Sequence, residues 1–575
     1  MPSSSSSRLG SAIFRCKATA LQARRAFYDR RDGVRAHPQQ EIPDEWRQLY
    51  EVRSPLWNDA GEVDAELERG KVQNLRAAVR QLNGIRVESG KVFSFWAQIG
   101  RATKRRGFVA GRLLREGCLM PAVGGGLCQL SNALYDLALQ ASLEVIERHA
   151  HSRVIAGSAA KLGRDATVAW NYIDLRFRAN EPFAVCAHLT REELVVSLWG
   201  CRNGVESDEI VGASSFVPLM LFESRPELQA LAHSCASCGD TECFRHDARP
   251  RRSEGQCAWI VDEAWPEWAR LANTEGASNR ILLAPRPELW PREGWQSIEG
   301  APLRAWQRSL RTRGAARSSA GGAVWRTQLE TSERLAQALE NRLTSEATHI
   351  VVAQSLLPFL WRSGALGGRT FDVLLTRAPL DELAACLDGV FRLVGDSALS
   401  DFRAPQSLVR AEREALDAAR TVYTSHAQLV VGFGNRGKRV DWERPNVAAY
   451  NASGRHDALV LAGSALARKG AYAVRDAARE LDLPLVIAGR DWMGENFWEG
   501  VTLRKLGGDE SWLDHARVAV LPAFVEHAPR PLLRALVAGV PVVASRECGL
   551  GEREGVVTVP SGDSEALIKA LRDFF

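Results

Sequence analysis

The stretch Ala458-Leu459-Val460-Leu461-Ala462-Gly463-Ser464 places a short apolar run directly before a glycine. A run of this length that ends in a turn residue predicts a buried strand followed by a loop. Similar runs precede helical stretches on both sides of it, at residues 280–284, 349–353, 371–375, 484–487 and 518–521. Strands that alternate with helices are typical of parallel α/β sheets. We therefore expect two Rossmann-like α/β lobes, over residues 261–445 and 446–575, with a break near residues 445–455.

The composition of the 575-residue chain is that of an ordinary globular protein, with 45% hydrophobic and 25% charged residues. It excludes a disordered chain, a collagen-like chain and a small disulfide-stapled scaffold. The sequence has no apolar stretch of about 18 residues or more, so we expect no transmembrane helix. A net charge of +5 is too small for a nucleic-acid-binding protein, which needs a concentrated basic face.

Residues 1–45 are predicted to form a polar, basic leader, and residues 46–202 a compact domain of mixed α+β structure. Arginines and a lysine interrupt any apolar core in the leader, so it is no signal peptide. We expect a frayed, solvated segment; the alternative is a basic amphipathic helix over residues 8–30 that touches a membrane surface. The expected location is the cytoplasm, with the inner face of the membrane as the alternative. Within the domain, the pattern predicts helices at residues 74–82 and 130–141 and strands at residues 167–177 and 194–198.

A glycine-rich run opens the second of these helices, because Val123-Gly124-Gly125-Gly126-Leu127 lies directly before Cys128. The amides and the positive dipole end of a helix N-terminus stabilise a thiolate, the nucleophilic form of cysteine. His151, which shares a predicted strand with another histidine, could act as a base, and Asp165 could orient it. Cysteine-dependent chemistry is one interpretation. A buried structural cysteine and a binding pocket without catalysis are the others.

The same region resembles the VanW-like family in several motifs that occur in the family's order. They are Asn74-Leu75, Asn83-Gly84-Ile85, Gly90 to Trp96, Gly100, Gly107-Phe108, Gly124 to Tyr135, Glu147 to Ser152, Gly163 to Trp170 and Tyr172 to Arg178. The family takes its name from an accessory protein of vancomycin-resistance clusters. The resemblance implies a link to the cell envelope, but it implies no particular reaction.

A compact group of soft metal ligands lies in the connector predicted over residues 203–260. Its members are Cys235, Cys238, Cys243 and His246. Tetrahedral zinc accepts three cysteines and one histidine. Alternatively, Cys257 could supply the fourth thiolate of an iron–sulfur cluster, or the connector could hold no metal. We expect a structural staple between the two halves of the chain.

A phosphate-binding element is predicted where the first strand of the C-terminal lobe ends, from Gly463 to Gly470. Loops at the carboxyl ends of parallel strands bind phosphates in open α/β sheets. Only nine of the 74 basic residues are lysines, and one of them, Lys469, lies in this loop, where it could neutralise a diphosphate. Glu526 follows another strand, and its carboxylate could hold sugar hydroxyls.

These features resemble the C-terminal domain of GT-B glycosyltransferases, in particular the group 1 retaining family. The matching parts are Lys469-Gly470, Glu526 and the run from Ala538 to Ser545. The resemblance implies an acceptor lobe over residues 261–445 and a lobe over residues 446–575 that binds a nucleotide-sugar donor. The donor-binding residues that it implies are Gly463, Ser464, Arg468, Lys469, Gly470, Glu526 and Arg534.

Two positions depart from the family's pattern. Ser464 stands where the family usually has an arginine that helps to hold the diphosphate. Arg534 stands where the family usually has a second glutamate that meets the donor's ribose. Arg468, Lys469 and Arg534 together could compensate for phosphate charge, because the arginine fork suits phosphate oxygens. Donor binding is therefore expected to be unusual or lost.

The first hypothesis is a glycosyltransferase that moves a sugar from a nucleotide-activated donor to an envelope-related or secondary-metabolite acceptor, with retention of configuration. Its catalytic residues would be Lys469 and Glu526, and its acceptor a glycan or peptide-glycan. We expect no nucleic-acid partner; peripheral membrane contact is an alternative. The second hypothesis is acyl or amide chemistry on a peptide-bearing cell-wall substrate, carried by Cys128, His151 and Asp165. The third is a non-catalytic scaffold in which both halves bind glycan.

Overall fold

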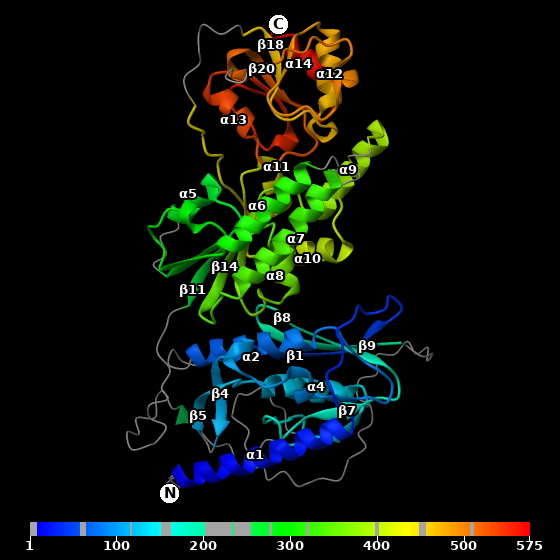
Figure 1. Ribbon diagram of the computed structural model, residues 1–575, viewed down its shortest axis with the longest axis vertical. Coiled ribbons are helices and arrows are strands. Elements are labelled where there is room, and N and C mark those ends of the chain that lie inside the picture. The colour runs from blue at the N-terminus through cyan, green and yellow to red at the C-terminus, as the bar shows by residue number, and fades with distance from the viewer. Residues whose placement is uncertain are drawn as a thin grey trace. The chain divides into compact units, whose positions relative to one another are not determined.

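The computed structural model describes residues 8–57, 65–115, 118–150, 163–201, 233–234, 255–274, 279–317, 321–396, 399, 402–447, 456–506 and 511–575. The chain forms two compact units (Figure 1). Unit 1 runs from the N-terminus to Gly255 and includes residues 344–348 and 363–369; unit 2 holds the remainder up to Phe575. Within the described ranges, no helix combines the length and the apolar character that crossing a membrane requires.

Unit 1 combines antiparallel strand pairs with helices. Its sheets have the orders β1-β9-β8-β2, β3-β7-β6 and β10-β5-β4, and only the short pair β10–β5 is parallel among these described strands. The helices are α1 (Arg8–Arg31), α2 (Ala65–Leu82), α3 (Phe95–Ile99) and α4 (Cys128–Gln140). The strands are β1 (Arg47–Pro55), β2 (Ile85–Val87), β3 (Val92–Ser94), β4 (Ala110–Arg115), β5 (Cys118–Val123), β6 (Glu144–Glu147), β7 (Arg176–Arg178), β8 (Phe183–Leu189), β9 (Glu193–Gly200) and β10 (His233–Ser234).

Close backbone approach fixes helix α2 against the β4–β5 hairpin. A Cβ on Gly70 would overlap the carbonyl oxygen of Ala110, so a larger residue would push the helix away. Asn74, which is fully buried, donates to the carbonyl oxygens of Val109 and Gly125 at 3.1 and 2.9 Å. The buried amide is thereby itself satisfied by backbone groups of the hairpin and of the turn that follows it. These contacts hold the glycine-rich turn at the start of α4.

Helix α1 replaces the frayed leader that we expected. Arg25 forms an ion pair with Glu147 through two hydrogen bonds of 2.5 Å. Gln22 donates to the carbonyl oxygen of Trp170 at 2.6 Å. The helix is therefore attached to unit 1 by side chains whose partners lie more than 120 residues away in sequence.

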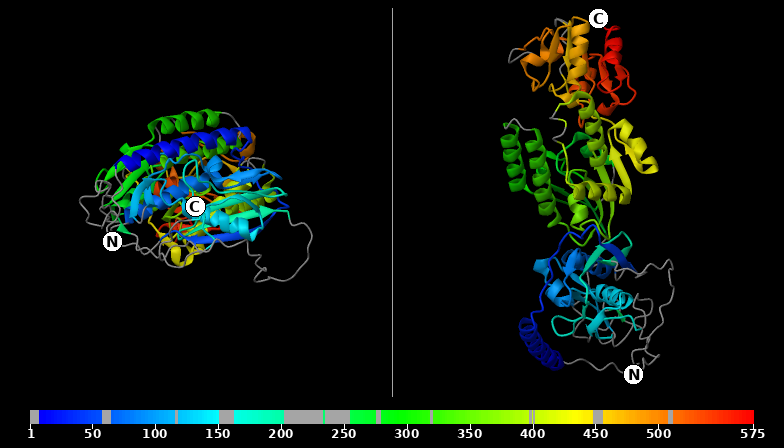
Figure 2. Two further views of the ribbon diagram at one scale, coloured as in Figure 1. Left: turned by 90° about the horizontal axis from the view of Figure 1, so that it is seen from below. Right: turned by 90° about the vertical axis from the view of Figure 1, so that its right-hand side faces the viewer.

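The first lobe of unit 2 carries a sheet in the order β13-β12-β11-β14-β15-β16-β17. Helices α6 and α7 run side by side in front of this sheet (Figures 1 and 2). The strands are β11 (Gln256–Ile260), β12 (Arg280–Ala284), β13 (Ser297–Gly300), β14 (Ala347–Ala353), β15 (Thr370–Leu375), β16 (Thr421–Thr424) and β17 (Gly437–Arg439). The helices are α5 (Pro266–Thr274), α6 (Pro302–Arg317), α7 (Gly321–Glu340), α8 (Leu357–Arg362), α9 (Leu380–Val394), α10 (Gln406–Ala418) and α11 (Ala427–Gly432).

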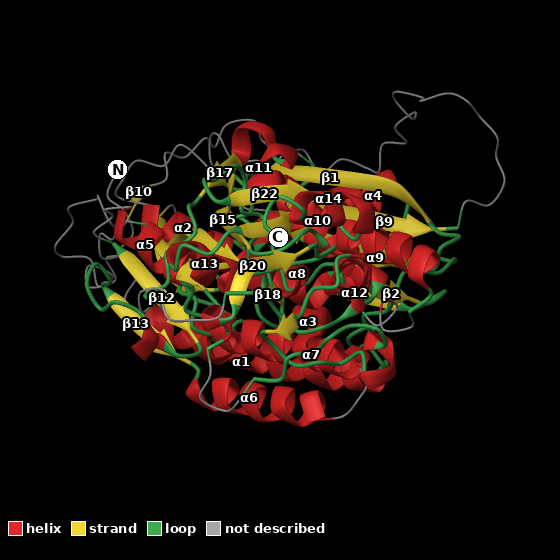
Figure 3. Ribbon diagram, turned by 90° about the horizontal axis from the view of Figure 1, so that it is seen from above, coloured by secondary structure: helices red, strands yellow, loops and turns green. Residues whose placement is uncertain are grey.

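The second lobe of unit 2 carries a parallel sheet in the order β19-β18-β20-β21-β22. Helix α13 covers one face of it, and α12 and α14 cover the other (Figures 1 and 3). The strands are β18 (Ala458–Leu461), β19 (Leu485–Ile487), β20 (Ala516–Leu521), β21 (Val542–Ser545) and β22 (Val556–Val559). The helices are α12 (Ala471–Glu480), α13 (Arg530–Val537) and α14 (Ser564–Leu571).

The expected fold class is confirmed: an N-terminal part with antiparallel sheets precedes two parallel α/β lobes. Every strand predicted in the two lobes is present, because each is a continuous apolar run buried on both faces. The strand predicted over residues 167–177 is wrong for most of its length. Ala169 and Ile173 pair with each other across a turn, and β7 begins only at Arg176. The break expected near residues 445–455 lies mostly outside the described residues.

Candidate functional site

The carboxyl ends of the parallel strands in the second lobe lie at one edge of its sheet. After β18 the chain moves outward to β19 and then returns to the other side of β18 as β20. The strand order therefore reverses between β18 and β20, and ligands of open α/β sheets bind in the crevice at such a point. Lys469 follows β18 and Glu526 follows β20, so both predicted catalytic residues belong to loops at this reversal.

Lys469 and Glu526 form an ion pair between the lysine Nζ and the glutamate Oε2. Both side chains are nearly buried, with 13% and 11% of their surface exposed. The other carboxylate oxygen, Oε1, accepts hydrogen bonds from the backbone N–H groups of His527 and Ala528 at 2.8 and 3.0 Å. The carboxylate is thus held by one cation and two amides.

Burial and ion pairing shift the pKa values of Lys469 and Glu526 in opposite directions. Burial lowers the pKa of Lys469, although the negative charge of Glu526 acts to raise it. Burial also acts to raise the pKa of Glu526, but the charge and hydrogen bond of Lys469 and the amide of Ala528 bring that pKa below its ordinary value. Burial and the charge of Lys469 lower the pKa of the neighbouring His527 to about 3. That imidazole is therefore neutral near pH 7.

The loop that carries Lys469 is held tightly against the end of β20. Gly470 has a φ of 80°, and a Cβ there would overlap the carbonyl oxygen of Pro522. Arg468 accepts a hydrogen bond from the backbone of Phe524 through its carbonyl oxygen, at 3.0 Å, and its guanidinium lies 5.1 Å from the ring centroid of Phe402. The close fit of Gly470 explains why Lys469 and Glu526 meet.

Gly463 and Ser464 shape the other end of this loop. The carbonyl oxygen of Gly463 accepts the N–H of Gly489 at 3.0 Å. Ser464, which replaces the family's arginine, accepts the backbone N–H of Arg490 at 3.2 Å through its hydroxyl. Ser464 therefore ties the loop to the end of β19 and brings no charge to the site.

The N-terminus of α13 offers few donors to a phosphate. The N–H groups of His527 and Ala528 are used by Glu526, and the N–H of Arg530 donates to the carbonyl oxygen of Ala528 at 2.7 Å. Pro529 and Pro531 have no N–H at all. Helix N-termini bind phosphates through such amides, so cationic side chains gain importance for any phosphate at this helix.

Arg534, the second departure from the family's pattern, lies on the exposed side of α13. Joint compensation of phosphate charge by Arg468, Lys469 and Arg534 stays a prediction.

The contacts that join the two lobes of unit 2 near this crevice include two hydrogen bonds and an ion pair. His426 lies 2.9 Å through its Nε2 from the carbonyl oxygen of His527. The indole N–H of Trp442 donates to the carbonyl oxygen of Gly549 at 3.1 Å. The third contact is an ion pair between Glu267 of α5 and Arg530 of α13.

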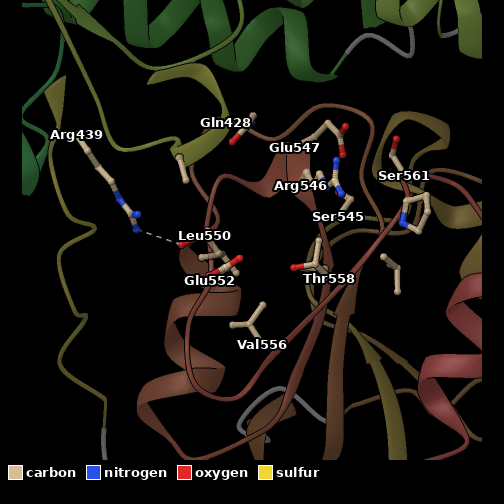
Figure 4. A pocket seen from close by; sticks show the side chains of 15 residues that line it. Gln428, Arg439, Ser545, Arg546, Glu547, Leu550, Glu552, Val556, Thr558 and Ser561 are labelled. Carbon is tan, nitrogen blue, oxygen red and sulfur yellow. Dashed lines mark hydrogen bonds between the residues drawn. The ribbon is translucent and has the colours of Figure 1, made fainter. Parts of the chain in front are cut away.

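A cavity of about 910 Å³ opens beside these contacts (Figure 4). Side chains from α11, from β17 and from the loops that follow β21 and β22 line it. Gln428, Arg439 and Glu547 are among its polar lining residues. The sequence did not indicate this cavity, because its walls come from four separate loops or strand ends that have no common motif.

In unit 1, the predicted nucleophile Cys128 is the first residue of α4 and is half-buried. Its sulfur lies 3.8 Å from the hydroxyl oxygen of Thr167. Ser131, one turn further along α4, donates to the carbonyl oxygen of Ala166 at 2.6 Å, which keeps the strand-like segment around Thr167 against the helix. The structure therefore places a threonine hydroxyl beside the thiol.

The predicted base and orienting group occupy different surroundings. Asp165 pairs with Arg148 at 2.8 Å. His149 lies in a loop after β6 instead of on a strand, and its Nε2 is 3.2 Å from the carboxylate of Glu147. His151 lies outside the described residues. The triad of Cys128, His151 and Asp165 stays a prediction.

The predicted metal ligands also lie outside the described residues. This holds for the whole set Cys235, Cys238, Cys243 and His246. Among the residues that the structure does describe, no three histidine, cysteine or acidic side chains gather in a way that could hold a metal ion. The zinc and iron–sulfur hypotheses remain predictions of the sequence.

Family models match one segment in each half of the chain. Residues 70–199 match the family model described as VanW like protein, and residues 458–575 match the model described as Glycosyl transferases group 1. The chain thus carries a VanW-like domain in its N-terminal part and a group 1 glycosyltransferase region at its C-terminus. Both expected resemblances are confirmed.

Two curated proteins are similar to the N-terminal part. The vancomycin B-type resistance protein VanW of Enterococcus faecalis is 34% identical over 135 residues, which are 23% of this chain and 48% of that protein. The uncharacterized protein YoaR of Bacillus subtilis is 28% identical over 133 residues, which are 23% of this chain and 43% of that protein. The chain thus spans just under half the length of either relative.

Solved structures similar to this chain include glycosyltransferases. A sucrose-phosphate synthase from Thermosynechococcus elongatus is 14% identical, with a TM-score of 0.34, and the match covers 56% of this chain and 89% of that structure. WaaG, a glycosyltransferase involved in lipopolysaccharide biosynthesis, is 14% identical with a TM-score of 0.33, over 55% of this chain and 90% of that structure.

Proposed function

We propose that unit 2 is a retaining glycosyltransferase that uses a nucleotide-sugar donor. The acceptor would be an envelope-related glycan or peptide-glycan, or a secondary metabolite, and the VanW-like domain would recognise it. The observation that carries the proposal is the buried pair of Lys469 and Glu526 at the reversal of strand order, in a region that matches group 1 glycosyltransferases. The domains proposed are residues 46–202, 203–260, 261–445 and 446–575, after the leader over residues 1–45.

In the proposed reaction, Lys469 and Arg468 neutralise the diphosphate of the donor. The arriving diphosphate competes with the Glu526 carboxylate for the ammonium of Lys469, and as a whole it carries two negative charges against the one of the carboxylate. Positive charge fixed at this place also stabilises the leaving diphosphate as the glycosidic bond breaks. Glu526, released from the lysine but still held by two amides, would accept hydrogen bonds from donor hydroxyls.

A binding screen tests the first half of the proposal. The full chain is titrated with UDP-, GDP-, ADP- and dTDP-sugars at millimolar concentration while its thermal unfolding is followed. At least one of them should raise the melting temperature, because a ligand that binds only the folded state stabilises it. If none of the nucleotide sugars changes the melting temperature, the proposal is wrong.

Variants test the second half. Lys469→Ala should weaken binding of the identified donor by about tenfold or more, because a charge-assisted hydrogen bond is lost. Glu526→Gln should reduce donor hydrolysis while leaving nucleotide binding within about twofold, since the amide keeps the shape but loses the charge. Lys569→Ala and Glu480→Gln, at exposed positions of the same lobe, are the matched controls. If Lys469→Ala and Lys569→Ala have equal effects, Lys469 does not take part in donor binding.

A further inference from the structure

We propose that helix α6 attaches the first lobe of unit 2 to an anionic lipid surface, with the helix axis lying along that surface. The helix runs from Pro302 to Arg317 and lies beside α7 (Figures 1 and 2). The sequence had pointed to membrane contact only in residues 8–30, which form part of unit 1. The inference concerns neither the donor site nor the VanW-like domain, so it does not depend on the proposed glycosyltransferase reaction.

The first argument is an apolar stripe on the outer face of α6. Leu303, Trp306 and Leu310 are 62%, 58% and 46% exposed. Their spacing of three and four positions places them on one face of a helix. Ala305, which points away from this stripe, is 9% exposed, so the helix packs on the lobe with smaller residues and leaves its largest apolar side chains in solvent. A surface helix normally has the reverse orientation, with its apolar stripe toward the core.

The second argument is the charge of the same helix. Its sequence contains five arginines and no acidic residue. Arg304 and Arg311, seven positions apart, follow one edge of the apolar stripe, and Arg313 lies at the other edge, seven positions after Trp306. Cations beside an apolar stripe that contains tryptophan and leucine are typical of helices that lie in a membrane interface.

Arg304 and Arg313 keep their positive charge uncompensated by their hydrogen-bond partners. Arg304 donates to the side-chain oxygen of Gln307 at 2.9 Å. Arg313 donates to the hydroxyl of Ser309 at 2.8 Å. Both acceptors are neutral, so these bonds orient the two guanidinium groups without neutralising them.

The other two arginines have acidic partners of different strength. Arg311 lies 3.7 Å from Glu330 of α7, and the two side chains are 48% and 61% exposed, so this pair is weak. Arg308, on the inner side of the helix, is 19% exposed and donates to the carboxylates of Asp262 and Glu263 at 3.5 and 3.4 Å. Arg308 therefore belongs to the lobe, whereas the arginines beside the stripe remain available to an external anion.

The stripe and the arginines together favour an anionic bilayer over a protein partner. Single exposed leucines are ordinary on protein surfaces, but a row of large apolar residues marks an interaction site. Tryptophan is enriched where a membrane meets water, because its ring is apolar and its N–H is polar. Arginine extends its apolar stem along acyl chains while its guanidinium stays among the headgroups. A protein partner would need carboxylates on both sides of an apolar groove, whereas an anionic bilayer supplies both everywhere.

The test is flotation of the full chain with lipid vesicles of two compositions. Vesicles of phosphatidylcholine with about a third phosphatidylglycerol should bind the chain at least about tenfold more tightly than vesicles of phosphatidylcholine alone, because anionic lipids attract the arginines. Salt at about 1 M should weaken this binding, because the Debye length falls to about 3 Å. If the chain does not float with the anionic vesicles, or floats equally with both kinds, the inference is wrong.

Variants with a single apolar change locate the contact. Trp306→Ser should weaken binding to the anionic vesicles by about tenfold or more, because the largest apolar side chain of the stripe is lost. Val431→Ser, at a position of α11 that is 81% exposed, is the matched control and should bind like the natural chain. Phe27→Ser, at a position of α1 that is 67% exposed, tests the N-terminal helix and should also bind like the natural chain. The inference is overturned if Trp306→Ser behaves like Val431→Ser, or if Phe27→Ser abolishes the binding.

Charge variants and a measurement without lipid complete the test. The double variant Arg304→Gln and Arg313→Gln should weaken binding to the anionic vesicles by about tenfold, and the melting temperature should stay that of the natural chain, because both positions are exposed. Sedimentation velocity without lipid then compares the natural chain with Trp306→Ser. If the natural chain is a dimer that Trp306→Ser dissociates, the stripe is a protein interface and the inference is overturned.

Discussion

Glu267 and Arg530 join the two lobes of unit 2 through hydrogen bonds of 2.7 and 2.6 Å. The side chain of Glu267 is fully buried, and it also accepts the backbone N–H of Glu443 at 2.7 Å. The guanidinium of Arg530 lies 5.5 Å from the ring centroids of both Trp265 and Trp442. Removing the carboxylate would leave the guanidinium beside the two rings without its anion, and removing the guanidinium would leave a buried carboxylate without its cation.

Arg530→Met is therefore expected to lower the free energy of unfolding of unit 2 by about 3 kcal/mol, since Glu267 stays buried without its cation. Urea denaturation of the full chain, followed by tryptophan fluorescence, measures the change. Arg572→Met, at an exposed position, is the control and should stay within about 0.5 kcal/mol of the natural chain. If the two variants are equally stable, the interlobe pair contributes nothing.

The same pair predicts how unit 2 responds to acid. Burial acts to raise the pKa of Glu267, but Arg530 and the amide of Glu443 bring it below its ordinary value near 4.5. A lowered carboxylate pKa stabilises the fold fully above the ordinary value, and this stability is lost as the pH falls through the lowered pKa. Denaturation experiments between pH 3 and 7 should therefore show that the free energy of unfolding falls below about pH 4.5. This fall should be smaller in Glu267→Gln. Identical slopes would contradict the assignment.

Restoring the family's pattern in the second lobe should tighten nucleotide binding. Ser464→Arg adds the cation that the loop lacks, and Arg534→Glu supplies a carboxylate on α13 for the ribose. With Pro529 and Pro531 removing amide donors, an added guanidinium should raise nucleotide-sugar affinity by about tenfold. Titration of the double variant with UDP-glucose and GDP-mannose measures this. Unchanged or weaker binding of both would mean that the loop is not a diphosphate site.

A buried lysine in unit 1 offers a spectroscopic test. Burial lowers the pKa of Lys71 to about 8, although its Nζ lies 2.7 Å from Glu68. Because the chain has only nine lysines, ¹³C-lysine labelling gives a spectrum with few signals, and Lys71→Met assigns the one that disappears. That signal should titrate near pH 8. A Lys71 midpoint above pH 10 would show that pairing with Glu68 outweighs burial.

Cysteine accessibility separates a reactive thiol from a structural one. Burial raises the pKa of Cys548 to about 12, and it also raises the pKa of Cys386. Cys128 is half-buried at a helix start beside Thr167, and the sequence predicts that this position favours the thiolate. Brief iodoacetamide labelling at pH 8, read by mass spectrometry, should modify Cys128 well before Cys548. Thr167→Val should slow the labelling of Cys128, and a Cys548 that reacts as fast as Cys128 would refute the comparison.

The sequence predicted those parts of the fold that depend on the residue pattern of a short segment. A buried parallel strand is a continuous apolar run, so the strand that ends at Leu461 and the loop with Lys469 could be placed without a structure. Glu526 could be placed for the same reason. The meeting of the two residues follows from the reversal of strand order, which the local pattern suggests but does not determine.

The features that could not be predicted depend on contacts between distant segments. Arg25 of α1 pairs with Glu147, and no local periodicity connects residues that lie 122 positions apart. The strand predicted around Trp170 failed because alternation of apolar residues does not reveal a tight turn between Ala169 and Ile173. The cavity beside Gln428 was missed because its lining comes from separate loops.

The interlobe contacts have a consequence for kinetics. Opening the crevice would have to break several of them together, among them the Glu267–Arg530 pair, the Trp442–Gly549 hydrogen bond and the His426–His527 hydrogen bond. A molecule enclosed between the lobes would then leave only as often as these contacts release at once. The residence time of such a ligand would be set by the protein's own opening rate and not by the strength of its contacts alone.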